Sequence, residues 1–212
     1  MPSTARARNR RRGRPPATPS HETRARILRA ARRCFAETGY ARATNKQIAA
    51  AAGVTAAALY NHFPSKSALF VAAFEEAQGE LVRRYRHAIA GKNDAVRALC
   101  AIVDASAKAD AEDPSLTRFM SVVMTEMRSH EDLRAGVGRV PNQIGALIAD
   151  LVSEGRRSGR LSRRIPAEAV VEMLIAAIAG LALAASEKPP ESHPGVLHAF
   201  RALLAGTLVK NN

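Results

Sequence analysis

The feature that most constrains the fold of this chain is the order of helix-starting and helix-ending residues between positions 44 and 66. Thr44-Asn45-Lys46-Gln47 fits a capping box, in which the hydroxyl and the glutamine side chain reciprocally satisfy free amides at a helix start. Gly53 tolerates the left-handed conformation and ends this helix, Thr55 caps a second helix, and Pro64 terminates it. The sequence therefore predicts two short helices joined by a tight turn.

The sizes of the side chains in this stretch indicate how the two helices pack. Apolar residues occupy the positions that must be buried where two helices cross at a steep angle: Ile48, Ala52, Val54, Leu59 and Phe63. Ala49 and Gly53 are small where the two backbones approach each other. This arrangement is typical of a helix-turn-helix, whose first helix braces the second at the angle that fits the major groove of DNA.

Helical periodicity continues on both sides of this unit. Apolar residues recur at three- and four-residue steps in a helix over roughly 20–38, which Gly39 ends, and in a long helix from Ser65 to about Ala90. Further helices are predicted near 94–111, 115–128, 141–158, 166–186 and 194–209. Aromatic residues make up only 4% of the chain and alanine is abundant, which favours closely packed helices. We find no strand-like alternation, so the sequence predicts an all-α fold with about nine helices.

The charge is distributed unevenly along the chain. Residues 1–66 hold 14 Lys and Arg against 2 Asp and Glu, a net +12 out of the total of +13. Apart from Met1, residues 1–17 contain no large apolar side chain, so we expect a basic arm that is disordered when free. The predicted organisation is therefore this arm, a helix-turn-helix domain over 18–66, and a larger, nearly neutral helical domain over 67–212. A basic module of this kind is suited to a polyanionic partner.

The stretch TNKQIAAAAGVTAAALYNHFPSKSALF, with Phe35, Gly39 and Tyr40 before it, resembles the tetracycline-repressor (TetR) family of bacterial regulators. The matching positions include Thr44, Ile48, Ala49, Ala52, Gly53, Val54, Leu59, Tyr60, His62, Phe63, Pro64, Lys66 and Leu69. The resemblance covers residues of about 20 to 75, and the rest agrees in helix number and length. It implies a homodimeric transcriptional regulator, a repressor released from its operator by a small, largely apolar ligand. Activation instead of repression stays open.

The same resemblance implies that four side chains contact DNA phosphates: Thr44, Tyr60, His62 and Lys66. Each carries a hydroxyl, phenol, imidazole or ammonium group that suits a phosphate oxygen. Two alternatives stay open at this point. Tyr60 would otherwise cap the small core, and His62 would otherwise be a buried, hydrogen-bonded residue.

Base contacts are expected from the second helix of the unit. After Thr55 at its start, helical periodicity places Ala56, Ala57, Tyr60 and Asn61 on the side opposite the buried residues. Family members often have a long polar side chain or glycine in this first turn, and the alanines depart from that pattern. Alanine methyls pack on thymine methyls, and an asparagine pairs with an adenine edge. We therefore expect a palindromic operator that leans toward A/T base pairs.

The basic arm contains a second candidate DNA contact. Arg12-Gly13-Arg14-Pro15 resembles the core of an AT-hook, an extended segment that lies in the narrow minor groove of A/T-rich DNA. Arg12 and Arg14 would then follow the enhanced negative potential of that groove. The alternative is a solvated tail that adds affinity without sequence preference.

The predicted C-terminal helices are apolar on broad faces, and in the resembled family the last two pair with their copies. The predicted dimer contacts are Val171, Leu174, Ile175, Ile178, Phe200 and Leu204. The alternative is that these helices pack within one monomer. The middle helices carry thioethers and aliphatic side chains that suit an adaptable apolar pocket. The predicted pocket residues are Phe119, Met120, Met124, Met127, Ile144, Leu147 and Ile148, with Glu126 or Arg128 as a polar anchor. Ordinary core packing is the alternative for each of them.

Other classes of function find little support in the sequence. There is no phosphate-binding glycine loop, no nucleophile motif and no metal-ligand spacing of His, Cys, Asp or Glu, so we expect no enzyme, metal or cofactor. Cys34 and Cys100 are interpreted as reduced core residues. The longest uncharged apolar run, 173–186, is shorter than the roughly 20 residues that span a bilayer, so a cytoplasmic protein is expected. An architectural DNA-binding protein without ligand control is the remaining alternative.

Overall fold

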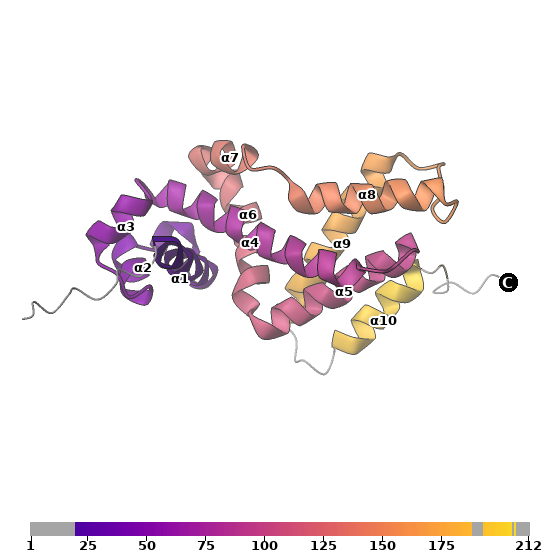
Figure 1. The fold of residues 1–212 in the computed structure, drawn as a ribbon, viewed down its shortest axis with the longest axis horizontal. Helices are drawn as coiled ribbons and strands as arrows, with labels where there is room; N and C mark the ends of the chain where they lie inside the picture. The colour runs from indigo at the N-terminus through magenta and orange to yellow at the C-terminus, as the bar shows by residue number, and fades with distance from the viewer. Residues whose placement is uncertain (1–19, 188–192, 205, 207–212) are drawn as a thin grey trace, which may run out of the picture.

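The computed structural model describes residues 20–187, 193–204 and 206, and within these ranges all regular structure is helical (Figure 1). The helices are α1 (Ser20–Arg42), α2 (Asn45–Ala51), α3 (Ala56–His62), α4 (Lys66–Ile89), α5 (Ala95–Glu112), α6 (Pro114–Ser129), α7 (Glu131–Gly138), α8 (Gln143–Arg157), α9 (Ala167–Glu187) and α10 (His193–Leu204). The all-α prediction is confirmed. The basic arm lies outside the described residues.

Helix α7 is the one element that the sequence analysis missed among the described helices. The helices predicted near 115–128 and 141–158 left this region as a connection, but residues 131–138 are helical, with Leu133 and Val137 buried on the inner side. Gly136 is needed for close packing, because a Cβ there would lie 2.7 Å from a methyl of Val71 on α4. The glycine therefore brings α7 against α4 and does not end a helix.

The predicted caps of the helix-turn-helix are confirmed. The amide of Gln47 donates to Thr44 Oγ1 at 3.2 Å, and the Gln47 side chain accepts from the Thr44 amide at 3.0 Å. Thr55 Oγ1 accepts from the amide of Ala58 at 3.1 Å. Gly53 has a φ of 65° and Gly39 a φ of 75°, so each interrupts the helical backbone where only glycine is unstrained. These local signals fix the lengths of α2 and α3.

Two hydrophobic clusters make up the core. The first joins α1, α2, α3 and the start of α4 to α6 and α7. Its centre is aromatic: the ring centroids of Phe35 and Phe70 are 5.0 Å apart, and those of Phe70 and Phe119 are 5.1 Å apart. The second cluster joins the rest of α4 to α5, α8, α9 and α10. Packing therefore crosses residue 66, and α4 runs lengthwise through both parts (Figure 1).

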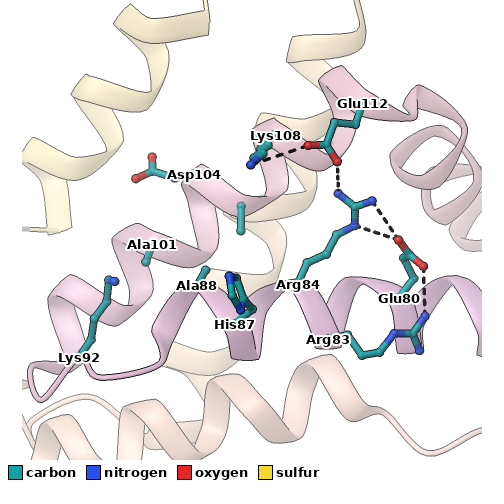
Figure 2. A pocket seen from close by; sticks show the side chains of 11 residues that line it. Glu80, Arg83, Arg84, His87, Ala88, Lys92, Ala101, Asp104, Lys108 and Glu112 are labelled. Atoms are coloured by element: carbon teal, nitrogen blue, oxygen red, sulfur yellow. Dashed lines mark hydrogen bonds and ion pairs between the residues drawn. The ribbon is translucent and has the colours of Figure 1, made fainter.

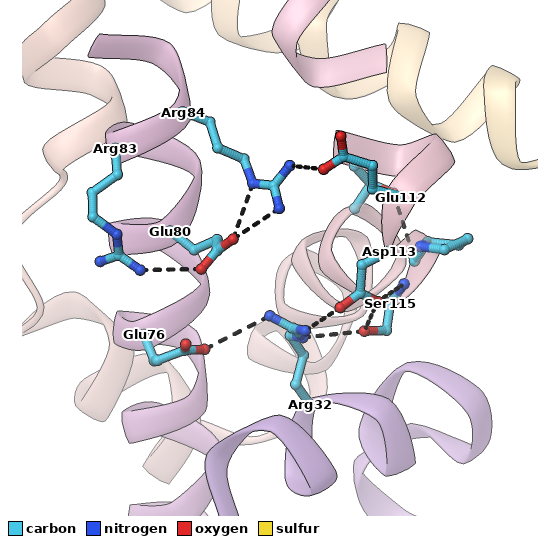
Figure 3. A network of polar contacts seen from close by, with 10 residues as sticks. Arg32, Glu76, Glu80, Arg83, Arg84, Glu112, Asp113 and Ser115 are labelled. Carbon is cyan, nitrogen blue, oxygen red and sulfur yellow. Dashed lines mark hydrogen bonds and ion pairs between the residues drawn. The ribbon is translucent and has the colours of Figure 1, made fainter. Parts of the chain in front are cut away.

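A buried charge links three helices beside the aromatic centre (Figure 3). Arg32 of α1 is only 3% exposed. Its Nε donates to Ser115 Oγ at 3.1 Å, its Nη1 lies 3.7 Å from Glu76 Oε2 of α4, and its Nη2 pairs with Asp113. Asp113 is also the N-cap of α6, where it accepts from the Ser115 amide at 3.1 Å. The Arg32 guanidinium thus ties α1 to α4 and to the start of α6.

The ionisation of Asp113 reflects this environment. Burial alone would raise the pKa of its carboxyl, but hydrogen bonds from Ser115 and the charge of Arg32 together lower it below its usual value of 3.8. A carboxyl whose pKa is depressed by folding stabilises the folded state above its unfolded pKa. That contribution is lost as the pH falls through the lower, folded pKa.

We therefore expect Asp113→Asn to reduce the free energy of unfolding by about 2 kcal/mol at neutral pH, since hydrogen bonds to charged groups contribute about 1.5–3 kcal/mol. Asparagine still caps α6, so the loss reports the pairing with Arg32. Urea unfolding at several pH values measures it, and the difference from wild type should shrink below about pH 4. Glu112→Gln is the matched control, because Glu112 is a 47% exposed partner of Arg84 whose loss should cost less than about 1 kcal/mol. Equal effects of the two variants at neutral pH contradict the assignment.

Candidate nucleic-acid interface

Helix α3 presents an exposed face made of the residues that the sequence predicted. Thr55 and the α3 residues Ala56, Ala57, Tyr60 and Asn61 are all exposed. The Tyr60 side chain is 52% exposed, so the alternative in which it caps the small core is wrong. This face offers methyl groups, one phenol and one carboxamide, which suits a groove with thymine methyls and adenine edges.

The opposite side of α3 is anchored in the core. Leu59 is 0% exposed and Phe63, which caps the C-terminus of α3, is 3% exposed. The guanidinium of Arg24 lies 5.4 Å from the centroid of the Phe63 ring. Arg24 was not among the predicted site residues, since its position on α1 gives no sign in the sequence that it reaches the end of α3. It places a positive charge at the C-terminal end of α3.

Thr44 and His62 lie at the two outer ends of the helix-turn-helix. Thr44 is exposed at the start of α2, where its hydroxyl donates to Gln47 Oε1 at 2.8 Å and completes the capping box. His62 is the last residue of α3 and is half-buried, with its ring centroid 6.3 Å from that of Phe63. Both side chains are therefore accessible near the exposed face, and the prediction of phosphate contacts by them stays a prediction.

Lys66 has a different environment from the one predicted. Its Nζ donates to the carbonyl oxygens of Tyr40, Ala41 and Ala43 at 2.9, 3.3 and 3.2 Å. It also lies 4.4 Å from the centroid of the Tyr40 ring. Three carbonyl oxygens of the protein thus accept from the ammonium group, and the phosphate contact of Lys66 stays a prediction. The residue joins the start of α4 to the end of α1.

The end of α1 is held a second time by α6. The Tyr40 amide donates to Glu126 Oε1 at 2.8 Å, and His130 Nε2 lies 3.2 Å from Glu126 Oε2. Burial, together with the negative charge of Asp132, raises the pKa of the Tyr40 phenol, which stays protonated at neutral pH. Glu126 was expected to anchor a ligand, but this carboxylate instead binds the helix-turn-helix to the rest of the chain.

The predicted pocket residues do not gather around one apolar cavity. Phe119 belongs to the first cluster, whereas Leu147 and Ile148 belong to the second, with Ile144 packed against it. Met120 packs against both clusters and Met127 against the first. Met124 is 63% exposed, so its assignment to a pocket inside the protomer is wrong.

A cleft of about 630 Å³ does lie between α4 and α5, but its lining is charged (Figure 2). Arg84 bridges its walls, since its Nε donates to Glu80 Oε1 at 3.0 Å and its Nη1 to Glu112 Oε2 at 2.6 Å. The hydrogen bond from Arg84 lowers the pKa of Glu112. This cleft is chemically unlike the apolar pocket that the sequence suggested.

The predicted dimer residues fall into two groups. Leu174 is 2% exposed and Ile178 is 8% exposed, and both lie in the second core cluster. Their assignment to a surface between protomers is therefore wrong, because each already faces its own core. Val171, Ile175, Phe200 and Leu204 are half-buried at the edge of that cluster.

The described residues also bear on the questions of membrane spans, metal sites and reactive cysteines. In the described ranges no helix has the length and apolar character to cross a membrane. Among those same residues no group of three or more His, Cys, Asp or Glu side chains is placed to hold a metal ion. Cys34 and Cys100 are free thiols, each half-buried.

An exposed helix that packs on a capped partner helix through a few buried side chains, here Ile48 and Ala49, is typical of a helix-turn-helix DNA-binding protein. The family model "Bacterial regulatory proteins, tetR family" matches residues 27–73, and the model "BetI-type transcriptional repressor, C-terminal" matches residues 95–209. The chain belongs to the TetR family of bacterial regulatory proteins. The family consists of transcriptional regulators, not enzymes.

Individual relatives agree with this assignment. The HTH-type transcriptional repressor Rv1474c of Mycobacterium tuberculosis is 28% identical over 175 residues, which cover 82% of this chain and 88% of that protein. Salmonella enterica GusR has a TM-score of 0.73 and 27% identity, covering 91% of this chain and 98% of that one. FadR from Bacillus subtilis, in complex with stearoyl-CoA, has a TM-score of 0.72 and 20% identity, covering 87% and 99%. The last likeness is one of fold.

The environment of Lys66 leads to a testable distinction. Lys66→Met removes three hydrogen bonds from a charged donor, so the free energy of unfolding should fall by about 1.5–3 kcal/mol. The salt dependence of DNA binding should stay as in wild type. Lys46→Met is the matched control, because Lys46 is exposed on α2 and its loss should change stability by less than about 0.5 kcal/mol. A Lys66→Met protein of wild-type stability whose salt slope drops by about 0.9 per protomer would show a phosphate contact instead.

Proposed function

We propose that this chain binds an operator as a homodimer and represses transcription until a small, largely apolar ligand releases it. The observation that carries the proposal is the exposed face of α3, fixed from behind by buried Leu59 and Phe63. A single short helix makes few contacts, and two copies on adjacent half-sites multiply a weak interaction.

The proposed contacts divide into those that position and those that specify. Thr44, Tyr60 and His62 contact phosphates, and Arg24 adds charge beside them. Thr55, Ala56, Ala57 and Asn61 face the bases. Arg12 and Arg14 lie outside the described residues, and we propose that they follow the minor groove beside the half-site.

Selection of bound fragments from random duplex DNA tests this function, using the full chain and a chain that lacks residues 1–15. A regulator selects a palindrome with half-sites about 34–36 Å apart. Its A/T preference beside the half-sites should weaken when the arm is removed. An architectural protein would coat DNA and enrich no discrete site, and this outcome would overturn the proposal.

Asn61 is the residue expected to contribute most to base choice. Asn61→Ala removes the carboxamide that pairs with an adenine edge, so discrimination at one base pair of each half-site should fall by about 1–3 kcal/mol. Binding to the selected site and to its single-base variants measures the loss. Asn93→Ala is the control, since Asn93 is exposed in the loop between α4 and α5. Unchanged discrimination by Asn61→Ala contradicts the base contact.

The structure suggests where a second copy would pack. Ala169, Met173, Ala176 and Gly180 are exposed at three- and four-residue steps along one side of α9. Met173 is 56% exposed, as is Leu203 on α10. Small residues let two helices approach closely, and exposed large apolar side chains gain from burial. We propose this surface, and not the buried Leu174 and Ile178, as the dimer contact.

Met173→Glu places a charge in this contact, so it should convert the dimer to a monomer and weaken operator binding. Sedimentation velocity measures the mass of each species. Met124→Glu is the matched control, because Met124 is equally apolar and 63% exposed but lies on α6, outside α9 and α10. A dimer that persists in Met173→Glu but dissociates in Met124→Glu would place the interface elsewhere.

For the ligand we propose an apolar molecule that enters beside α6. The site would open between the two core clusters, next to Met120 of α6. Met120 supports this arrangement because its flexible side chain packs against both core clusters. FadR from Bacillus subtilis, which has this fold, binds stearoyl-CoA, a ligand with an apolar acyl chain and a charged CoA part.

A further inference from the structure

Helix α1 carries a row of arginines on the side that faces away from the aromatic core. Arg26, Arg29 and Arg33, here called the α1 arginine row, recur at steps of three and four residues, and all three are exposed. They line a groove of about 520 Å³ whose other wall includes Gln47 and Ala51 of α2. The row therefore borders the outer side of the helix-turn-helix.

The arginines of this row form no ion pairs within the described ranges. Arg33 nevertheless lies near enough to Asp113 to help lower the pKa of that carboxyl. Glu37, four residues after Arg33 on α1, lines the same groove. By contrast, the buried Arg32 on the same helix forms ion pairs with Glu76 and Asp113. Three positive charges within eight residues therefore face solvent together.

The row is continuous with the candidate DNA interface. Gln47, which lines the groove, also forms the capping box with Thr44 at the exposed start of α2. Helix α2 packs against both α1 and α3. At the other end of the row, Arg24 reaches the C-terminus of α3 through Phe63. A duplex seated on α3 would therefore extend past α2 toward the row.

We propose that the α1 arginine row binds the phosphate backbone of the same duplex, outside the major-groove half-site that α3 contacts. Guanidinium groups bind phosphate oxygens in a bidentate manner and do so without sequence preference. Each protomer would thus hold a flanking backbone segment that α3 does not touch. This inference rests on the proposed function, because it requires an operator to which α3 binds.

The test uses the full chain and its selected operator in two lengths, the bare palindrome and the palindrome with about ten added base pairs on each side, roughly one helical turn. The variant is Arg26→Gln, Arg29→Gln and Arg33→Gln together. The dependence of Kd on salt is measured for both duplexes. Each phosphate contact contributes about 0.9 to the slope, so removing six per dimer should lower it by about 5 on the long duplex. The slope on the short duplex should hardly change, and base preference should stay as in wild type.

Two further variants separate charge from folding and from general electrostatics. The triple lysine variant at the same positions keeps the charges, so it should retain most of the wild-type slope. Arg118→Gln, Arg128→Gln and Arg139→Gln together remove an equal charge from exposed positions on and after α6 and α7, and should leave the slope unchanged. Melting temperatures of all variants show whether the fold is retained.

The possible outcomes lead to different conclusions. A wild-type chain that selects no operator overturns the proposed function itself. If the wild-type chain selects an operator but the glutamine variant keeps the wild-type salt slope on the long duplex, this inference alone is overturned. The α1 arginine row would then bind some other acidic partner. An equal loss of slope on both duplexes also overturns it, because the contacts would then lie inside the half-site.

Discussion

The buried guanidinium of Arg32 is the constraint on which the placement of the helix-turn-helix depends. Removing a charged group from water costs several kcal/mol unless its hydrogen bonds are satisfied. The acceptors here, Ser115 and Asp113, lie at the start of α6, and Glu76 of α4 forms a longer ion pair with the same guanidinium. Helix α1 cannot tilt away from the start of α6 without leaving this charge buried and unpaired. Because α2 packs on α1 and α3 packs on α2, the direction in which α3 faces depends on this pairing.

Helix α6 contacts α1 near both the start and the end of α6. Near its start, Asp113 and Ser115 bind Arg32, and near its end Glu126 accepts the amide of Tyr40. Between them the rings of Phe35 and Phe119 are stacked with centroids 6.0 Å apart. A shift of α6 would therefore displace α1 as a unit. Met120 lies on the same helix and packs against the second core cluster, so α6 is placed to couple that cluster to the DNA-binding face.

What the sequence predicted correctly is local, and what it missed depends on neighbours distant in the chain. The caps at Thr44 and Thr55 are contacts between residues three apart, and the pattern alone determines them. The partners of Lys66 are carbonyls 23 to 26 residues earlier, which no short motif specifies. Similarly, the broad apolar surface of α9 predicts burial but does not show which side faces the protomer's own core. Such a helix reveals its outer face only when its neighbours are in place.

Base recognition and affinity are separated in this molecule. The exposed face of α3 has small side chains, and Asn61 supplies its one carboxamide, so base-specific hydrogen bonds are few. The positive charge, by contrast, is concentrated in residues 1–66, in the arm and on α1. Phosphate contacts are sequence-independent and screened by salt, whereas methyl and carboxamide contacts are specific and nearly independent of salt. In such a domain, charge supplies most of the affinity for DNA. Sequence preference must come from a few weak base contacts, which each of the two protomers makes once. The dimer sets the spacing between these two sets of contacts.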